Sequence, residues 1–141
     1  KYSKIGKGNV IEAYAKICNN VILGNHCLIS SFSCINHDQQ ISDNVFISGH
    51  VGLTGTSVGF GTIISEGAIV GLKKKIGKNC LIGKNVTIGP FVSIGDNISI
   101  GNSVKISKAI VSDNTIINSN MIIYESIISG KNILSSNDNI L

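Results

Sequence analysis

Residues 76–99 read IGKNCL-IGKNVT-IGPFVS-IGDNIS, four successive units of six residues that each begin with Ile and Gly. The same period extends in both directions from this stretch, because an aliphatic residue recurs every six positions along nearly the whole chain. Three units, which begin at Leu53, Ile106 and Ile123, are one residue shorter and reset the register. The 141 residues therefore consist almost entirely of 24 short tandem repeats.

Each unit has the composition of a short strand followed by a corner. The first position is Ile, Val or Leu, the second is often Gly, and the fifth is commonly small or apolar. Three units close a triangular coil in which the first-position side chains stack along the axis. Glycine at the second position suits a corner whose backbone adopts conformations that a side chain would oppose. We predict a single all-β domain over residues 1–141, a parallel β-helix of about eight coils with no insertion loop, which the Ser/Asn-rich tail continues.

The composition narrows the functional classes. The Lys residues are scattered and the net charge of +4 is modest, so the basic stripe needed to bind nucleic acid is missing from the sequence. No apolar run is long enough for a membrane span, and no signal-peptide pattern is present, so we expect a cytoplasmic protein. The four cysteines form no CxxC pair, and Cys27 and Cys80 occupy the fifth position, where the repeat favours a compact buried residue.

Residues 35–40 (INHDQQ) are the strongest departure from the repeat, because four of the five residues after the aliphatic anchor are His37, Asp38 and two glutamines. Counting units in threes places His37 about one rung, ~4.8 Å, from Gly55 in the next coil. A histidine can remove a proton near neutral pH, and an adjacent carboxylate can orient it. A bare glycine offers its backbone amide to a carbonyl oxygen. These groups together are suited to acyl transfer.

The array resembles the hexapeptide-repeat transferases, and residues 33–55 resemble the family of sialic acid O-acetyltransferases and bacillosamine N-acetyltransferases. The family's motif is a His followed by an acidic residue, usually Cys, an aliphatic residue and Gly-Asp, and here residues 37–43 read HDQQISD. The resemblance implies a left-handed coil, acetyl-CoA as the acyl donor and a nucleotide-linked sugar as the acceptor. By this match His37 is the general base, Asp38 is its acidic companion, and Gly55 contacts the acetyl thioester.

The sequence departs from this family in three respects. Gln39 replaces the usual Cys, and Phe46 stands where the family commonly has a second His. The family's N-terminal nucleotide-sugar domain is not among these 141 residues, so the chain is expected to be part of a longer protein.

Further residues are candidates for binding the two substrates. Lys73, in a run of three lysines at a predicted corner, and Lys84 are candidates for binding the phosphates of CoA, although a solvated basic corner is an equal alternative. Phe32 and His50 hold the same place in the fifth and eighth units and, with Asn36, are candidates for lining a substrate pocket. Packing of Phe32 against a neighbouring subunit is an equal alternative, since the resemblance implies a homotrimer with sites between subunits.

Two other functions remain open at this point. A γ-type carbonic anhydrase has the same fold and binds zinc through three histidines, but His26, His37 and His50 are predicted on three different walls, so we expect no metal. A non-catalytic spacer or scaffold is the second alternative, because the Ser/Asn-rich tail is similar to the β-helical extensions of sugar nucleotidyltransferases. Such an extension has no need of the departure at His37 and Asp38.

Overall fold

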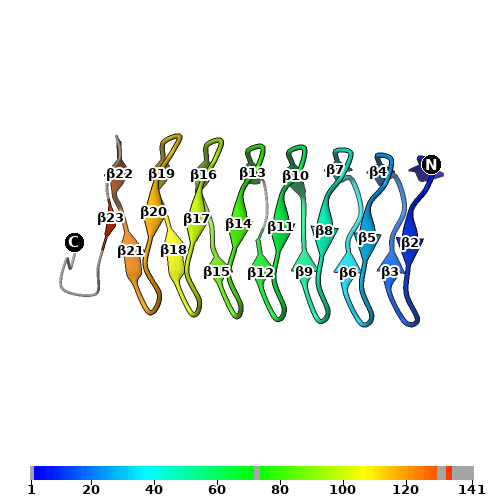
Figure 1. Ribbon diagram of the computed structural model, residues 1–141, viewed down its shortest axis with the longest axis horizontal. Helices are drawn as coiled ribbons and strands as arrows, with labels where there is room; N and C mark the ends of the chain where they lie inside the picture. The colour runs from blue at the N-terminus through cyan, green and yellow to red at the C-terminus, as the bar shows by residue number, and fades with distance from the viewer. Residues whose placement is uncertain (1, 72–73, 130–132, 135–141) are drawn as a thin grey trace.

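The computed structural model describes residues 2–71, 74–129 and 133–134, and within these ranges the chain forms short strands joined by corners. The strands build three parallel sheets, which are the walls of a triangular prism with β1 and β22 at opposite ends (Figure 1). Each strand pairs with the strand three places later in the chain. The prediction of an all-β, left-handed parallel β-helix is confirmed.

Each of the three sheets takes every third strand. Sheet A contains β1 (Lys4–Ile5), β4 (Ile22–Leu23), β7 (Gln40–Ile41), β10 (Thr56–Val58), β13 (Lys74–Ile76), β16 (Ser93–Ile94), β19 (Ile110–Val111) and β22 (Ile127–Ile128). Sheet B contains β2 (Val10–Ile11), β5 (Leu28–Ile29), β8 (Phe46–Ile47), β11 (Ile63–Ile64), β14 (Leu81–Ile82), β17 (Ser99–Ile100), β20 (Ile116–Ile117) and β23 (Ile133–Leu134). Sheet C contains β3 (Lys16–Ile17), β6 (Cys34–Ile35), β9 (Gly52–Leu53), β12 (Ile69–Val70), β15 (Thr87–Ile88), β18 (Lys105–Ser107) and β21 (Ile122–Tyr124).

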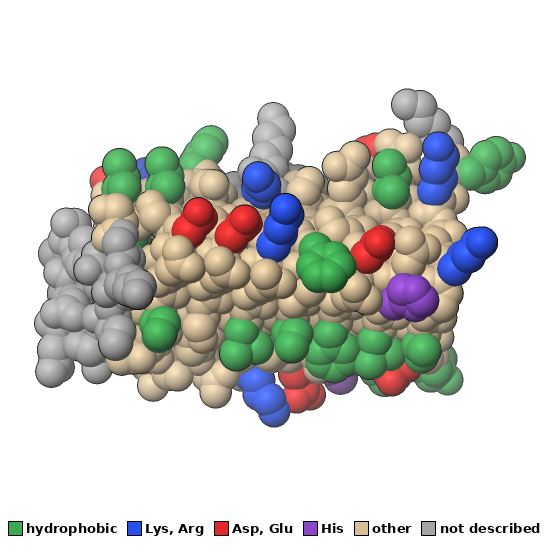
Figure 2. All heavy atoms as spheres, turned by 45° about the horizontal axis from the view of Figure 1, so that its top comes forward, with side chains coloured by type: hydrophobic (Ala, Val, Ile, Leu, Met, Phe, Trp, Pro, Cys, Tyr) green, Lys and Arg blue, Asp and Glu red, His purple; other side chains and the backbone are tan. Residues whose placement is uncertain are grey.

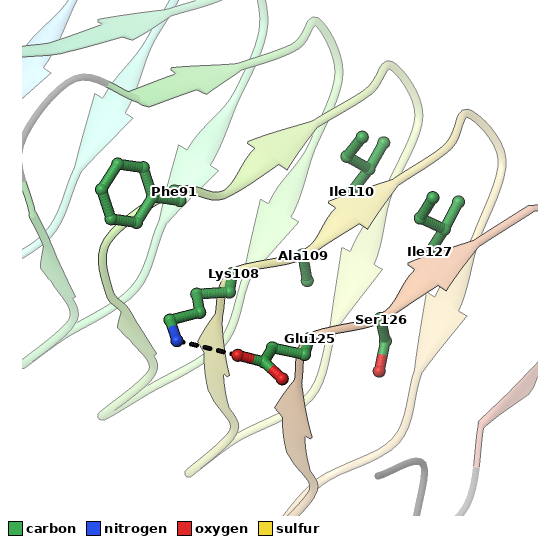
Figure 3. A pocket seen from close by; sticks show the side chains of 7 residues that line it. All are labelled: Phe91, Lys108, Ala109, Ile110, Glu125, Ser126 and Ile127. Atoms are coloured by element: carbon green, nitrogen blue, oxygen red, sulfur yellow. Dashed lines mark hydrogen bonds and ion pairs between the residues drawn. The ribbon is translucent and has the colours of Figure 1, made fainter.

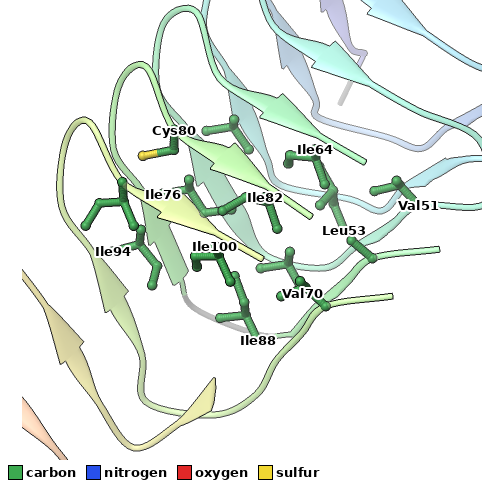
Figure 4. Packing of buried hydrophobic residues seen from close by; sticks show 14 of the residues in the cluster. Val51, Leu53, Ile64, Val70, Ile76, Cys80, Ile82, Ile88, Ile94 and Ile100 are labelled. Carbon is green, nitrogen blue, oxygen red and sulfur yellow. The ribbon is translucent and has the colours of Figure 1, made fainter. Parts of the chain in front are cut away.

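Most of the core consists of the first-position side chains, which stack in ladders inside the prism (Figure 4). From Leu23 to Ile128 each of them is at most 3% exposed. In the first coil Ile5 and Ile11 are 51% and 42% exposed, because another coil covers them on one side only. The Ser/Asn-rich tail continues the ladder through Ile128, as predicted, and the last predicted unit, at Ile140, lies outside the described residues.

The fifth-position side chains also point inward. Cys27 and Cys80 are each 2% exposed, and burial is the main cause that raises the pKa of both thiols. They are the compact core residues that the repeat predicts. Gln39 is the large exception, since its side chain is buried at this position as well.

The corners are named after the sheets they connect, so that the C–A corner leads from a strand of sheet C to the next strand of sheet A. Each described residue with a positive φ lies at a corner, where it is the fourth residue of a six-residue unit or the third residue of a shortened one. Asn is the residue most often found there, as expected for a left-handed conformation.

The reason given above for the second-position glycines was wrong. Gly77 is not among the residues with positive φ, and what it requires is space. A Cβ on Gly77 would lie 2.1 Å from the carbonyl oxygen of Gly95 in the next coil. The coils approach each other too closely at this corner for a side chain.

Within the ranges given above, no helix is long and apolar enough to cross a membrane.

Candidate functional site

His37 and Asp38 lie at the C–A corner between β6 and β7 and form an exposed, ordered pair. His37 Nδ1 is 2.7 Å from Asp38 Oδ2, and the other carboxylate oxygen accepts a hydrogen bond from the Asn20 side chain one coil earlier. Asp38 is the left-handed residue of its corner, with a φ of 60°, and its N–H donates to the carbonyl oxygen of Asn19 at 3.2 Å. When Nδ1 carries the proton and donates a hydrogen bond to Asp38, Nε2 is unprotonated and can accept a proton.

Asn36 and Gln39 hold this corner against the next coil. Gln39 Nε2 donates to the carbonyl oxygens of Asn36 at 3.0 Å and Leu53 at 2.6 Å, and Asn36 Nδ2 donates to Thr54 Oγ1 at 3.0 Å. Gln39 thus occupies a position where the repeat favours a small residue, and its buried amide is accommodated by hydrogen bonds to backbone carbonyl oxygens. Its Oε1 has no hydrogen-bond partner among the described residues.

Gly55 occupies the same corner one coil further along, where the unit is one residue shorter. Ile35 pairs with Leu53 before the corner, but Gln40 pairs with Ser57 after it, so one residue is missing in the coil above the histidine. Gly55, with a φ of 57°, is the left-handed residue of the shortened corner and in that sense the counterpart of Asp38. The strand register thus places Gly55 in the coil next to His37, as predicted.

The backbone N–H of Gly55 differs from its counterparts at the two other shortened corners. There, the N–H groups of Lys108 and Glu125 donate to the carbonyl oxygens of Pro90 at 2.8 Å and Ser107 at 3.3 Å. Within the described part of the chain, the N–H of Gly55 makes no hydrogen bond. The coil next to the His–Asp pair therefore has a backbone donor that lacks an acceptor among the described residues.

Phe91, Lys108 and Glu125 continue the C–A corner toward the C-terminus, and the sequence analysis missed them. They line a shallow depression together with outward residues of sheet A (Figure 3). Lys108 Nζ lies 2.8 Å from Glu125 Oε1 and 2.6 Å from the Tyr124 hydroxyl. These hydrogen bonds raise the pKa of Lys108, and that of Glu125 is lowered chiefly by its bond to Lys108. Counting every third repeat unit from that of Gly55 toward the C-terminus would identify these corner residues from sequence alone.

The structure separates the remaining predicted residues from His37. Phe32 and His50 lie together at the B–C corner, with ring centroids 5.2 Å apart. Lys84 lies at the same corner, where its Nζ is 3.6 Å from Glu66 Oε2. Sheet C lies between this corner and the C–A corner of His37.

Two further predictions concern Lys73 and Phe46. Lys73 lies outside the described residues, and its neighbours Lys74 and Lys75 belong to β13 and not to a corner, because they pair with Thr56 and Ser57. Phe46, at the place of the family's second His, lies on β8 of sheet B.

The three histidines lie at three different corners, as predicted. His26 follows β4 at an A–B corner, His37 follows β6, and His50 follows β8. No group of three potential metal ligands occurs in the described part of the chain.

Residues 2–37 and 73–108 match the bacterial transferase hexapeptide family (six repeats). These segments make up half of the chain, and the chain belongs to this family. No curated protein matches the sequence.

Several solved structures share the fold. The UDP-N-acetylglucosamine acyltransferase of Francisella novicida is 20% identical, with a TM-score of 0.77 over 93% of this chain and 60% of that one. The acetyltransferase domain of PglB from Neisseria gonorrhoeae, in complex with acetyl coenzyme A, is 22% identical, with a TM-score of 0.66 over 70% of this chain and 48% of that one. The polysialic acid O-acetyltransferase OatWY is 20% identical, with a TM-score of 0.67 over 98% of this chain and 86% of that one. The chain spans about half the length of the first two.

Proposed function

We propose that the chain is the acyl-transfer part of an enzyme that moves an acetyl group from acetyl-CoA to an amino or hydroxyl group of a sugar. The observation that carries this proposal is the His37–Asp38 pair, next to an N–H of Gly55 that has no partner among the described residues. The fold shared with the acetyltransferase domain of PglB and with OatWY supports it.

His37 is the general base of the proposed reaction. Its Nε2 removes the proton of the acceptor group as the acceptor oxygen or nitrogen attacks the thioester carbon, and Asp38 stabilises the imidazolium that forms. The negative charge that develops on the thioester oxygen is stabilised by the N–H of Gly55. The tetrahedral intermediate then collapses, the carbon–sulfur bond breaks, and the CoA thiolate leaves with the proton that His37 returns.

We propose in addition that the protein is a homotrimer whose copies associate through sheet B. The outward side chains of this sheet form an apolar row in Figure 2, in which Val10, Ile63, Leu81 and Ile116 are 40–56% exposed. Leu28 and Phe46 continue the row, which is broken only by Ser99 among the described residues. Sheets A and C carry lysines and serines among their outward residues, so sheet B is the face best suited to burial.

The direct test is acetyl transfer from acetyl-CoA to a panel of amino sugars and nucleotide-linked amino sugars, with His37→Ala against His26→Ala. Both histidines are exposed corner residues, so neither change should affect folding. We expect His37→Ala to lower kcat roughly 100-fold or more and His26→Ala to leave it unchanged. Full activity of His37→Ala would contradict the assignment, and failure of the folded protein to bind acetyl-CoA would favour a spacer.

A further inference from the structure

The B–C corner carries a ladder of three stacked rings. The ring centroids of Tyr14 and Phe32 are 5.1 Å apart with an angle of 9° between the planes, and those of Phe32 and His50 are 5.2 Å apart with an angle of 15°. All three residues have φ values of 57–62°, a conformation that bulky side chains rarely adopt.

The ladder ends at His50 because the next residue in the series is Gly67. Gly67 has no side chain to cover the face of His50 that points away from Phe32, so that face is open among the described residues. A depression of about 480 Å³ lies here, lined by His50, Glu66, Gly67, Lys84 and Asn85. Its volume is in the range typical of small-molecule sites.

Polar groups surround this depression on the side opposite His50. Asn85 Oδ1 occupies the place where a Cβ on Gly67 would come, so the Asn85 amide lies against the backbone of that corner. Lys84 Nζ and Glu66 Oε2 are 3.6 Å apart and both side chains are more than half exposed. A flat ring inserted at the level of Gly67 therefore meets an imidazole face, an amide, a carboxylate and an ammonium group.

We infer that the base of a nucleotide stacks on His50 as the fourth ring of this ladder, with its phosphate on Lys84. A nucleobase is planar, and its edge carries the donors and acceptors that an amide and a carboxylate pair with. The ammonium group of Lys84 attracts a phosphate. The inference is independent of His37, and it rests on the proposed function only for the choice of nucleotides to test, which are those of CoA and of nucleotide-linked sugars.

The experiment is calorimetric titration of the folded protein with ADP, UDP, adenosine and uridine. We expect micromolar to submillimolar binding of at least one nucleotide, and we expect His50→Ala to weaken it about 5- to 150-fold. His50→Phe should restore the affinity because it keeps a stacking face. Lys84→Met should weaken the binding of the nucleotide and leave the affinity for the nucleoside unchanged. His26→Ala, at the matching position of another corner, is the control.

The outcomes are distinguishable. Tighter binding of ADP, with competition by CoA, identifies the base as the adenine of the donor, and tighter binding of UDP identifies it as part of the acceptor. The inference is overturned if His50→Ala leaves the affinity unchanged. It is also overturned if neither nucleotide binds at about 1 mM, the upper end of typical KM values. If His37→Ala abolishes acetyl transfer while either of those two results holds, the proposed function stands and the nucleotide site does not.

Discussion

His37 Nδ1 lies 2.7 Å from Asp38 Oδ2, although both side chains are more than 60% exposed to solvent. Exposed ion pairs are usually worth little because water competes with them and both side chains lose rotamer freedom. Here the carboxylate is also held by the side chain of Asn20, and the backbone of Asp38 is anchored to Asn19. The arrangement therefore fixes the orientation of the imidazole more than it stabilises the fold.

Asp38→Asn separates these two effects. Asn is tolerated in the left-handed conformation of this corner, so we expect the melting temperature to change by only a few degrees. Loss of the carboxylate charge removes the stabilisation of the imidazolium, so kcat for acetyl transfer should fall roughly tenfold or more with little change in KM. An unchanged kcat would show that Asp38 does not assist His37.

Gly55→Ala tests whether the acyl donor approaches the backbone at this corner, because alanine keeps the N–H and adds a Cβ beside it. A positive φ of 57° is unfavourable for alanine, so we expect a loss of about 1 kcal/mol in the free energy of unfolding. Gly61→Ala is the matched control, because Gly61 has a φ of 66° at an A–B corner. Both variants should lose stability in urea titrations, but only Gly55→Ala should lower kcat/KM for acetyl-CoA. Equal activity of the two variants would remove Gly55 from the site.

Much of the site could be predicted by counting units. The period places His37 and Gly55 at one corner, and the same count already puts Lys84 at another, since its unit is the fourteenth and that of His37 is the sixth. The pairing of backbone N–H groups could not be predicted, because it depends on how each shortened corner closes. Gly55 and Lys108 occupy equivalent positions in the repeat, yet only Lys108 donates to the previous coil. The requirement for glycine at position 77 could not be predicted either, because it arises from the short separation between neighbouring coils.

Gly77→Ala should be severely destabilising for that reason. The added Cβ would lie 2.1 Å from a backbone oxygen, which cannot move without displacing the next coil. Overpacking of this kind costs about 1–3 kcal/mol or more. Gly89 holds the same position in the repeat, but a Cβ there would lie 3.4 Å from its nearest neighbour, so Gly89→Ala should be close to neutral. Urea denaturation of both variants distinguishes this steric cause from a general requirement for glycine.

The buried thiols should make stability depend on alkaline pH. Burial raises the pKa of Cys27 and Cys80 above the ordinary value of 9.0, so the folded chain keeps these protons to higher pH than the unfolded chain. The resulting stability is fully present below pH 9 and is lost as the pH rises through the folded-state pKa values. We expect the free energy of unfolding to fall above about pH 9, and less steeply in a Cys27→Ala/Cys80→Ala variant. Cys34→Ala, at a partly exposed position, is the control.

The apolar row of sheet B predicts which surface mediates self-association. Leu81 is 46% exposed on sheet B, and Ile69 is 56% exposed on sheet C, so the two positions differ in their sheet more than in their exposure. A glutamate at the centre of an apolar interface leaves a desolvated charge, so Leu81→Glu should weaken the trimer at least about tenfold. Ile69→Glu should leave it intact. Sedimentation equilibrium measures both, and a trimer that dissociates with Ile69→Glu but persists with Leu81→Glu would move the interface to sheet C.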